Sequence, residues 1–235
     1  MEVSYVLAGY NESELIEEAV SRCVKALEKD FDDYELILIN DASKDNTLEI
    51  MNRCAQENPH IRVLDNLVNL NFGTSVLRGL KAAKKEWVVY NAVDLPLKPE
   101  LTKKLIRHAQ AYDVLVLERT AYGGVFWRKI TSNMNILLLN ILFPKLMKGT
   151  PIVNYVQIFR RSIIDRVMPL ARSPIFVWPE MIFRAKLLGL RVGNIKNRPD
   201  ISKVRKGAFG HPHDIIWGIY EMFRFKIRCM NNTVF

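Results

Sequence analysis

The sequence predicts an α/β fold built on a mostly parallel β-sheet with helices on both faces. Over the first half of the chain, short apolar runs alternate with segments of helical periodicity, which is the order that parallel β-α-β units require. The polar clusters of this half follow the apolar runs, and parallel sheets bind ligands at the carboxyl ends of their strands. With 235 residues and 49% hydrophobic content, the chain has the length and the apolar residues for one large domain.

Each predicted element of the first half follows from the spacing of its apolar residues. Continuous apolar runs predict buried strands, and apolar residues that recur every three or four positions predict helices. Asn11 and Glu14 stand in the positions of a capping box, which predicts that the first helix begins at residue 12. The predicted strands are residues 3–8, 35–40, 62–64, 87–94 and 113–118, and the predicted helices are residues 12–27, 43–55, 74–83 and 99–110.

The second half is less regular, and its elements are predicted more coarsely. Apolar residues mixed with polar ones predict one strand or bend, one helix that ends at Gly189, one basic loop and one amphipathic helix. These are residues 152–161, 179–188, 195–210 and 214–227, respectively.

Charge divides the chain into two unlike halves. Residues 1–118 carry 14 Lys and Arg against 20 Asp and Glu, and residues 119–235 carry 20 against 5, which gives net charges of −6 and +15. An excess of positive charge this large is typical of proteins that bind phosphate, nucleic acid or an anionic membrane. The chain has no recognised helix-turn-helix, zinc or RNA-recognition motif, so we expect no nucleic-acid partner.

Composition excludes several classes of protein. The high apolar content excludes a disordered chain. Three cysteines without a Cys-x-x-Cys spacing argue against a disulfide scaffold or a zinc knuckle, so we expect a reducing compartment. No stretch approaches the ~20 apolar residues of a membrane span, and the apolar run at residues 3–8 reads as a core strand rather than a signal peptide.

Four polar segments of the first half carry the candidate chemistry: AGYNESELI, INDASKDNT, NLNFGTSVLRGLKAA and NAVDLPLKPE. Asp41, just past a buried strand, is placed to accept a hydrogen bond from the N–H of a nucleobase, although it could instead cap the following helix. In their order and spacing, the four segments resemble the family 2 glycosyltransferases of the GT-A fold. Within that family, the chain resembles the dolichyl- or polyprenyl-phosphate sugar synthases, over about residues 1–210.

The resemblance implies a Rossmann-like GT-A domain over residues 1–210. Its nucleotide-sugar-binding half would comprise residues 1–118 and its acceptor half residues 119–210, and a C-terminal amphipathic helix would follow over residues 211–235. The nucleotide would be a UDP- or GDP-linked sugar.

The resemblance assigns the nucleotide contacts to strand-end residues. Tyr10 and Glu12 match a Tyr-Asn-Glu element that borders the base and the ribose. Asp41 matches the base-contacting residue of an Asp-Asp-Gly-Ser motif, in which Ala42 takes the Gly position. Gly73 matches a residue of an Asn-x-Gly-x-Gly loop, although an ordinary glycine at a helix entry would look the same.

The resemblance also implies a divalent metal ion, Mg²⁺ or Mn²⁺. Such an ion neutralises the charge that develops on the leaving diphosphate, and the family holds it with an Asp-x-Asp motif. The matching residues here are Ala92, Val93 and Asp94, so Asp94 is the candidate metal ligand and the first Asp is missing. The alternative is that Asp94 is only a turn residue before Pro96.

Basic residues of the second half are candidates for the phosphate groups of donor and acceptor, because a guanidinium binds phosphate through two hydrogen bonds. For each of them, the alternative is a solvated surface charge. Glu180 is a candidate general base or acceptor-positioning residue, and the alternative is a structural salt bridge to a nearby Arg. The phosphate candidates are Arg119, Arg128 (also placed in catalysis), Lys129, Gln157, Arg160 and Arg205.

The resemblance implies transfer of a sugar from a nucleotide sugar to a polyprenyl phosphate, with inversion, by a peripheral protein on the cytoplasmic face of a membrane. A lipid phosphate is already anionic at neutral pH and needs no base, which suits a half rich in cations and poor in carboxylates. Residues 130–148 and 214–228 are amphipathic segments typical of a bilayer interface, but core packing and a dimer contact would explain them as well. The alternative functions are transfer to a sugar hydroxyl of a glycan, and a non-catalytic nucleotide-binding scaffold.

Overall fold

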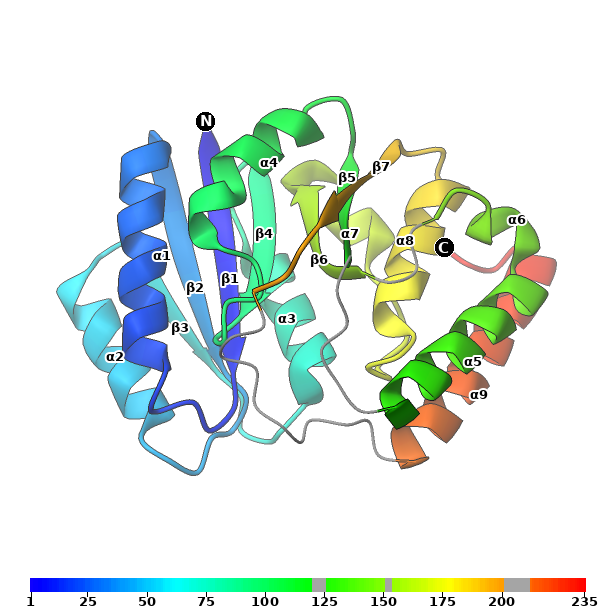
Figure 1. Cartoon of the computed structure of the whole chain (residues 1–235), viewed down its shortest axis with the longest axis horizontal. Helices are drawn as coiled ribbons and strands as arrows, with labels where there is room; N and C mark the ends of the chain where they lie inside the picture. Colours follow the sequence, from blue (N-terminus) through cyan, green and yellow to red (C-terminus); the bar gives the residue numbers. More distant parts are fainter. Residues whose placement is uncertain (120–125, 151–153, 201–211) are drawn as a thin grey trace.

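The computed structural model describes residues 1–119, 126–150, 154–200 and 212–235, without the side chains of residues 119, 126–131, 154, 155 and 212. The described residues form a seven-stranded sheet in the order β3-β2-β1-β4-β6-β5-β7 (Figure 1). Its strands are β1 (Glu2–Gly9), β2 (Asp33–Asn40), β3 (Ile61–Asp65), β4 (Trp87–Ala92), β5 (Val114–Arg119), β6 (Asn154–Arg160) and β7 (Val192–Asn197).

The prediction of a mostly parallel sheet is confirmed. Strands β3, β2, β1 and β4 are parallel, and β7 is parallel to β5, whereas β6 runs antiparallel to both of its neighbours. The register pairs Gly9 with Asn40 and Ala8 with Ala92, so β1, β2 and β4 end level with one another. The segments that follow these three strands therefore meet at one edge of the sheet.

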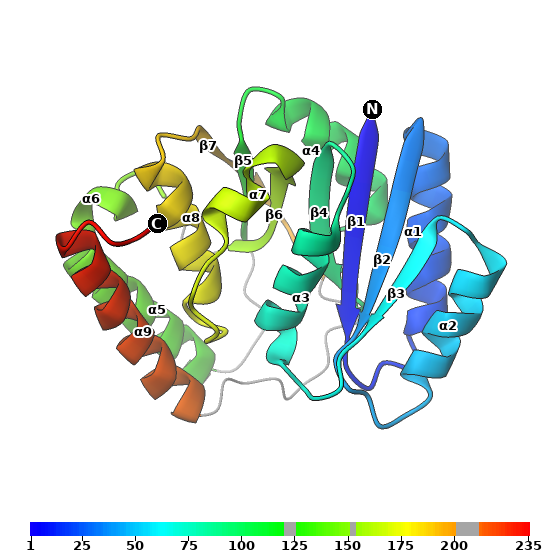
Figure 2. The same cartoon turned by 180° about the vertical axis from the view of Figure 1, so that it is seen from behind.

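Helices cover both faces of the sheet, as Figures 1 and 2 show from opposite sides. Helices α1, α2 and α4 pack on one face, and α3, α7 and α8 pack on the other. Helix α3 lies so close to the sheet that a Cβ added at Gly79 would lie 2.4 Å from Val6 Cγ1. The helices are α1 (Ile16–Asp30), α2 (Thr47–Glu57), α3 (Asn71–Ala82), the 3₁₀ turn η1 (Pro99–Leu101), α4 (Thr102–Ala109), α5 (Phe126–Leu142), α6 (Pro144–Met147), α7 (Arg161–Val167), α8 (Val177–Leu187) and α9 (Pro212–Met230).

A separate aromatic core joins the last helices to the domain. Phe143, Phe176, Phe183 and Phe225 are buried together, with ring centroids 5.1 to 6.4 Å apart. Phe183 lies in α8 and Phe225 in α9, whereas Phe143 directly follows α5 and Phe176 directly precedes α8. Helix α9 therefore packs against α8, the same helix that covers the sheet. No helix of the described residues is long and apolar enough to cross a membrane. The division of the chain at residue 210 stays a prediction.

Two predictions about elements were wrong, and one short helix was not predicted. The first helix begins at Ile16, not at residue 12, and Leu15 rather than Asn11 is its N-cap, because backbone N–H groups of residues 11–13 bind side chains of the loop after β2. The basic loop was expected over 195–210, but residues 195–197 are the last residues of strand β7 (Val192–Asn197). Residues 201–211 lie outside the described part. Helix α7 was not predicted, because its seven residues are too few to show a clear period.

Candidate active site

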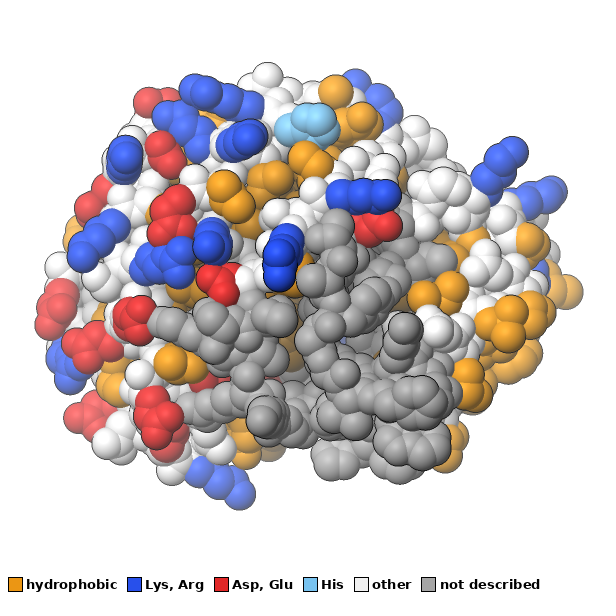
Figure 3. Space-filling view, in the orientation of Figure 1, with side chains coloured by type: hydrophobic (Ala, Val, Ile, Leu, Met, Phe, Trp, Pro, Cys, Tyr) orange, Lys and Arg blue, Asp and Glu red, His pale blue; other side chains and the backbone are white. Residues whose placement is uncertain are grey.

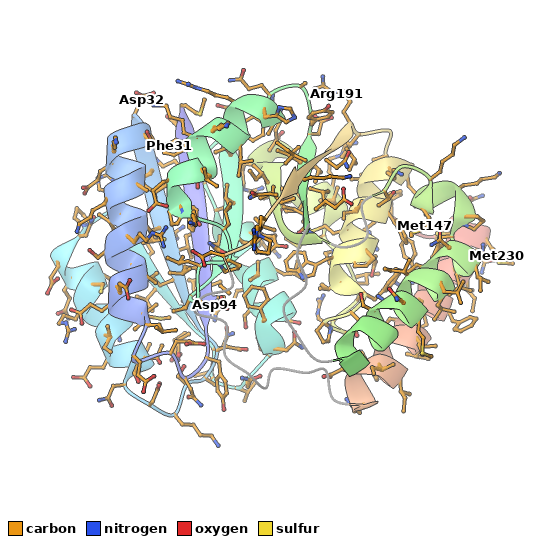
Figure 4. The ribbon with its side chains drawn as sticks, in the orientation of Figure 1. Phe31, Asp32, Asp94, Met147, Arg191 and Met230 are labelled. Atoms are coloured by element: carbon orange, nitrogen blue, oxygen red, sulfur yellow. The ribbon has the colours of Figure 1, made fainter. Side chains whose placement is uncertain are left out.

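The candidate site lies where β1, β2 and β4 end. Figure 4 shows Asp94 just past β4 at this edge of the sheet, and Phe31 and Asp32 at the opposite edge. Tyr10 and Glu12 follow β1, and Asp41 follows β2. The structure therefore brings together at one edge the four strand-end residues that the sequence singled out, Tyr10, Glu12, Asp41 and Asp94.

The Asp41 carboxylate is buried, with 3% of the residue exposed, and it ties β2 to the loop before α3. Its Oδ1 accepts hydrogen bonds from the backbone N–H of Leu70 at 2.8 Å and from Asn66 Nδ2 at 3.0 Å. Its Oδ2 accepts no hydrogen bond from the described residues. Asp41 does not cap the following helix, because α2 begins at Thr47 with Asn46 as its N-cap. One carboxylate oxygen therefore remains for a ligand.

Asn66 and Arg78 support Asp41, and the sequence analysis missed both. Asn66 is buried, and its amide also donates to Ser75 Oγ at 2.8 Å. Arg78 of α3 donates to Asn66 Oδ1 and to the backbone carbonyl of Asp65. This series of hydrogen bonds fixes the orientation of the Asn66 amide, and the amide in turn fixes the orientation of Asp41 Oδ1. Asn66 lies outside the four polar segments, and Arg78 lies within NLNFGTSVLRGLKAA without a role that the resemblance assigns, so only the folded chain reveals the contact.

The loops after β1 and β2 hold each other through backbone and side-chain hydrogen bonds. Asn11 has a φ of 54° and accepts a hydrogen bond from the Lys44 N–H at 2.7 Å. The Glu12 N–H donates to Thr47 Oγ1 at 2.8 Å, and Asp45 accepts from the Ser13 N–H at 3.1 Å. The loop that carries Tyr10 and Glu12 is thus fixed by the loop that carries Asp41.

Asp45 has a lowered pKa because of these contacts. Burial by itself raises the pKa of the Asp45 carboxyl, but hydrogen bonds from Thr47 and Ser13 outweigh that effect and hold it at about 2. Both hydrogen bonds favour the ionised carboxylate. The junction between the two loops therefore depends on the negative charge of Asp45.

The start of α3 also borders the site, beside the loops after β1 and β2. Asn71 has a φ of 65°, and its side chain caps the helix by accepting the Thr74 N–H at 3.2 Å. Asn69 donates to the backbone carbonyl of Asp41 at 3.1 Å. A Cβ added at Gly73 would lie 2.9 Å from Val177 Cγ1, so the packing of α3 on α8 already requires a glycine there. The role of Gly73 in nucleotide binding stays a prediction.

The turn after β4 presents Asp94. The Leu95 N–H donates to the Ala92 carbonyl at 2.9 Å and closes the turn, and Leu95 has a φ of 49°. The buried Asn91 anchors this turn, because its Nδ2 donates to Tyr5 Oη at 2.9 Å and to the Leu97 carbonyl at 2.7 Å. Asp94 is thus held at a defined place at the site edge.

The described residues do not form a metal site by themselves. No group of three or more His, Cys, Asp or Glu residues in this part of the chain could hold a metal ion. The turn after β4 offers the carboxylate of Asp94 alone, because Ala92 takes the place of the first Asp of the motif. The donor set that is present does not fit a resident divalent ion, and we derive no catalytic step through one.

Two second-half candidates, Arg160 and Gln157, contact other parts of the protein in the structure. Arg160 pairs in register with Trp87, at the end where β4 begins, and its guanidinium lies 4.4 Å from the centre of the Trp87 ring and binds Glu86. Gln157 is buried in β6, where it accepts a hydrogen bond from Tyr90. Their roles in phosphate binding stay predictions.

Glu180 is 1% exposed, and its oxygens are engaged by the protein. They accept hydrogen bonds from the Leu170 N–H at 3.1 Å, the Ala171 N–H at 2.8 Å and Arg184 Nε at 2.8 Å. The salt bridge that was the alternative for this residue is therefore present, and a catalytic role stays a prediction. The side chains of Arg119, Arg128, Lys129 and Arg205 lie outside the described part of the structure.

Comparison with known proteins identifies the family. The family description "Glycosyl transferase family 2" matches residues 4–168 of this chain. The chain belongs to glycosyl transferase family 2. Among its curated relatives, the undecaprenyl-phosphate 4-deoxy-4-formamido-L-arabinose transferase of Proteus mirabilis is 28% identical over 182 residues, which cover 74% of this chain and 54% of the relative. The dolichol-phosphate mannosyltransferase of Pyrococcus furiosus is 29% identical over 173 residues, which cover 71% and 48%.

A solved structure agrees with the architecture. A mannosyltransferase from Pyrobaculum calidifontis, in complex with GDP-Man and Mn²⁺, matches with a TM-score of 0.64 at 16% identity, over 96% of this chain and 64% of that chain. The likeness confirms the predicted GT-A fold, and the curated relatives confirm the predicted resemblance to polyprenyl-phosphate sugar transferases. The present chain spans about half the length of the curated relatives that it matches.

Ala42 has a φ of 60°, which is why a glycine suits this position of the motif. We expect Ala42→Gly to raise the free energy of unfolding by about 1 kcal/mol, because it removes a Cβ from a left-handed backbone. The matched control, Ala55→Gly in helix α2, should lower it by about 1 kcal/mol. Urea unfolding of both variants measures this, and a destabilising Ala42→Gly would contradict the strain.

Asp45→Asn tests the charge at the loop junction. The folded pKa of Asp45 lies below its ordinary value, so its ionisation stabilises the fold above about pH 4, and that contribution is lost as the pH falls toward 2. We expect Asp45→Asn to unfold at lower urea than the wild type at pH 7, and the difference to shrink steadily between pH 4 and pH 2. A difference that does not depend on pH would show that the charge is unimportant.

Proposed function

We propose that this chain transfers a sugar from a UDP- or GDP-linked donor to a polyprenyl phosphate at a membrane surface, with inversion at the anomeric carbon. The observation that carries the donor half of the proposal is the Asp41 carboxylate. It is buried at the edge where β2 ends, its Oδ1 is fixed by Leu70 and Asn66, and its Oδ2 is left for a ligand.

The chemistry of Asp41 selects a class of base. A carboxylate only accepts hydrogen bonds, so it prefers a base with a ring N–H on its pairing edge. Uracil and guanine have such an N–H, and cytosine and adenine do not. Tyr10, 41% exposed beside this edge, offers an aromatic ring to the base, and Glu12 lies two residues further on. Asp94 would then border the diphosphate and the sugar.

The state of Glu180 favours a phosphate acceptor over a hydroxyl acceptor. A hydroxyl nucleophile needs a base to take its proton, and both oxygens of Glu180 are held by backbone N–H groups. A lipid phosphate attacks with an oxygen that is already anionic at neutral pH. In-line attack by that oxygen on the anomeric carbon forms the new C–O bond as the bond to the nucleoside diphosphate breaks, which inverts the configuration. The protein then has to supply positioning and cationic support.

Helices α5 and α9 offer a surface that fits an anionic bilayer. Exposed apolar side chains recur on α9 at spacings of three and four residues, and α5 exposes three more; we call them the α5–α9 stripe (Figure 3, right). Both helices begin at the end of the molecule toward which β1, β2 and β4 run, to one side of the sheet (Figure 1). The stripe comprises Ile216, Tyr220, Phe223, Ile227 and Met230 of α9 and Met134, Leu137 and Ile141 of α5.

Charge favours a bilayer over a second copy of the chain as the partner of the stripe. Arg224, Lys226 and Arg228 lie on the same helix, whereas Glu221 of that helix is buried inward. A second copy would bring like charges together across a two-fold axis, but anionic head groups neutralise them. We therefore place the protein at a membrane surface, and the cytoplasmic face remains our expectation for it.

A second candidate function is a nucleotide-binding scaffold without transferase activity. It is favoured by Ala92, which removes one of the two carboxylates of the metal motif. Transfer from a labelled donor to polyprenyl phosphate separates the two candidates.

Transfer to lipid phosphate is the direct test. Purified protein, vesicles containing polyprenyl phosphate and radiolabelled UDP- or GDP-sugars should yield labelled lipid of inverted anomeric configuration. Asp41→Asn should weaken donor affinity about 10- to 100-fold, because it removes a charged acceptor, whereas Asp32→Asn at the opposite edge should leave it unchanged. Donor binding without any transfer would favour the scaffold, and no donor binding would contradict both candidates.

Metal dependence has its own measurement. Because Asp94 alone does not make a metal site, we expect Mn²⁺ without nucleotide to leave the melting temperature unchanged. Mn²⁺ together with the donor should raise it more than the donor does alone, since phosphate oxygens complete the coordination, and Asp94→Asn should abolish that extra rise. A rise with Mn²⁺ alone would show a resident metal site.

Binding to vesicles tests the α5–α9 stripe. We expect the protein to sediment with anionic vesicles and much less with neutral ones. Ile227→Glu should reduce binding about 10-fold, because it places a charge where an apolar side chain enters the interface. Leu187→Glu, at an exposed position of α8 outside the stripe, is the matched control and should bind as the wild type does. Equal binding by both variants would contradict the stripe as the docking surface.

A further inference from the structure

Residues 170–173, between α7 and α8, are held by two buried carboxylates. The N–H groups of Leu170 and Ala171 donate to Glu180 of α8. Those of Arg172 and Ser173 donate to Glu221 of α9, to Oε1 at 2.8 Å and to Oε2 at 2.9 Å. Four successive backbone N–H groups thus end on two carboxylates, and one of these comes from the helix that carries the α5–α9 stripe.

Glu221 also connects to the outer face of α9. Trp217, one turn earlier and 44% exposed, donates its indole N–H to Glu221 Oε1 at 2.9 Å. The backbone of α9 rests directly on the same segment, because a Cβ added at Gly218 would lie 2.2 Å from Ile175 Cγ1 and 2.7 Å from Ser173 Oγ. Helix α9 and residues 170–175 therefore move as one unit, or separate with the loss of these contacts.

The other side of the segment contacts the start of α3. The loop before α3 holds Asp41 through Leu70 and Asn66, and we call residues 66–71 the donor loop. Asn71 Nδ2 donates to the Arg172 carbonyl at 3.3 Å, across 101 residues of sequence. Asn71 is the residue whose positive φ starts α3, and the preceding Leu70 donates its N–H to Asp41 Oδ1. An unbroken series of contacts thus leads from Trp217 through Glu221, Arg172 and Asn71 to the loop that holds Asp41.

The chemistry of Glu221 makes it hard to replace. Its carboxylate is 8% exposed and accepts three hydrogen bonds through two oxygens, and bonds to a charged acceptor are stronger than neutral ones. An amide at this place has one oxygen, and its NH₂ group would face a backbone N–H. Glu221→Gln therefore loosens residues 172 and 173 without changing the shape of the side chain.

We propose that Glu221 is a positioning residue through which contact of α9 with an anionic bilayer tightens the binding of the nucleotide sugar. The proposal rests on the proposed function, since it assumes both the donor site and the docking of the stripe. Indole side chains favour the bilayer interface, so docking holds Trp217 and the α9 face in place. An ordered α9 keeps Glu221 on residues 172 and 173, and the Arg172 carbonyl then keeps Asn71 and the donor loop in the binding conformation. Such coupling is reciprocal, so the donor must tighten vesicle binding by the same factor.

The test is a four-way binding cycle on the full chain. Donor affinity is measured by calorimetry with and without anionic vesicles, and vesicle affinity with and without the donor, for the wild type, Glu221→Gln and Trp217→Phe. We expect vesicles to tighten donor binding on the order of 5-fold in the wild type, and this factor to fall to about 1 in both variants. Asp214→Asn, which also changes an acid of α9 to its amide, is the matched control and should keep the wild-type factor.

The coupling factor separates positioning from a merely structural role. A structural role lowers the melting temperature of Glu221→Gln and leaves the factor as in the wild type, which would overturn the proposal. Trp217→Phe keeps the carboxylate on residues 172 and 173, so it decides the matter even if Glu221→Gln does not fold. A wild type that binds donor and vesicles independently of each other overturns this proposal alone. A wild type that binds neither overturns the proposed function as well.

Discussion

The hydrogen bonds of the Asp41 carboxylate hold the proposed donor site together. They join the end of β2 to the loop before α3, and the contacts of Asn66 and Arg78 fix their direction. Because Asp41 also donates its backbone N–H to the Gly9 carbonyl at 3.0 Å, the loop after β1 is placed by the same residue. One buried residue at the sheet edge thus sets the positions of three segments, and its carboxylate still leaves an oxygen for the proposed nucleotide.

The charge asymmetry of the chain has a structural counterpart. The acidic half forms the parallel strands whose ends carry Asp41 and Asp94, and the basic half supplies β6, β7 and the helices of the aromatic core. Two of the five acids of the basic half, Glu180 and Glu221, are buried against backbone N–H groups. The 20 cations of that half outnumber its five acids, and such an excess of positive charge suits the proposed phosphate acceptor and anionic bilayer.

Sequence reasoning predicted the parallel strands and the meeting of their polar ends, because buried parallel strands are continuous apolar runs and their ends share an edge. It did not predict β7, whose sequence VGNIKN mixes apolar and polar residues at the edge of the sheet, or the reversed direction of β6, which the residue pattern does not encode. It also missed Asn66, Arg78 and Glu221, because their partners are set by tertiary packing. The salt bridge of Glu180 was open to prediction, since Arg184 lies four residues later on one helix.

We propose above all that the Asp41 carboxylate accepts a hydrogen bond from the ring N–H of the donor base. Methylated nucleotides test this hydrogen bond most directly. Calorimetry would compare UDP with N3-methyl-UDP, and GDP with N1-methyl-GDP, in the wild type and in Asp41→Asn. We predict that methylation weakens binding of the preferred nucleotide at least about 10-fold in the wild type, and that Asp41→Asn shows no such loss. Equal affinity of the wild type for the methylated and unmethylated nucleotides would contradict the account.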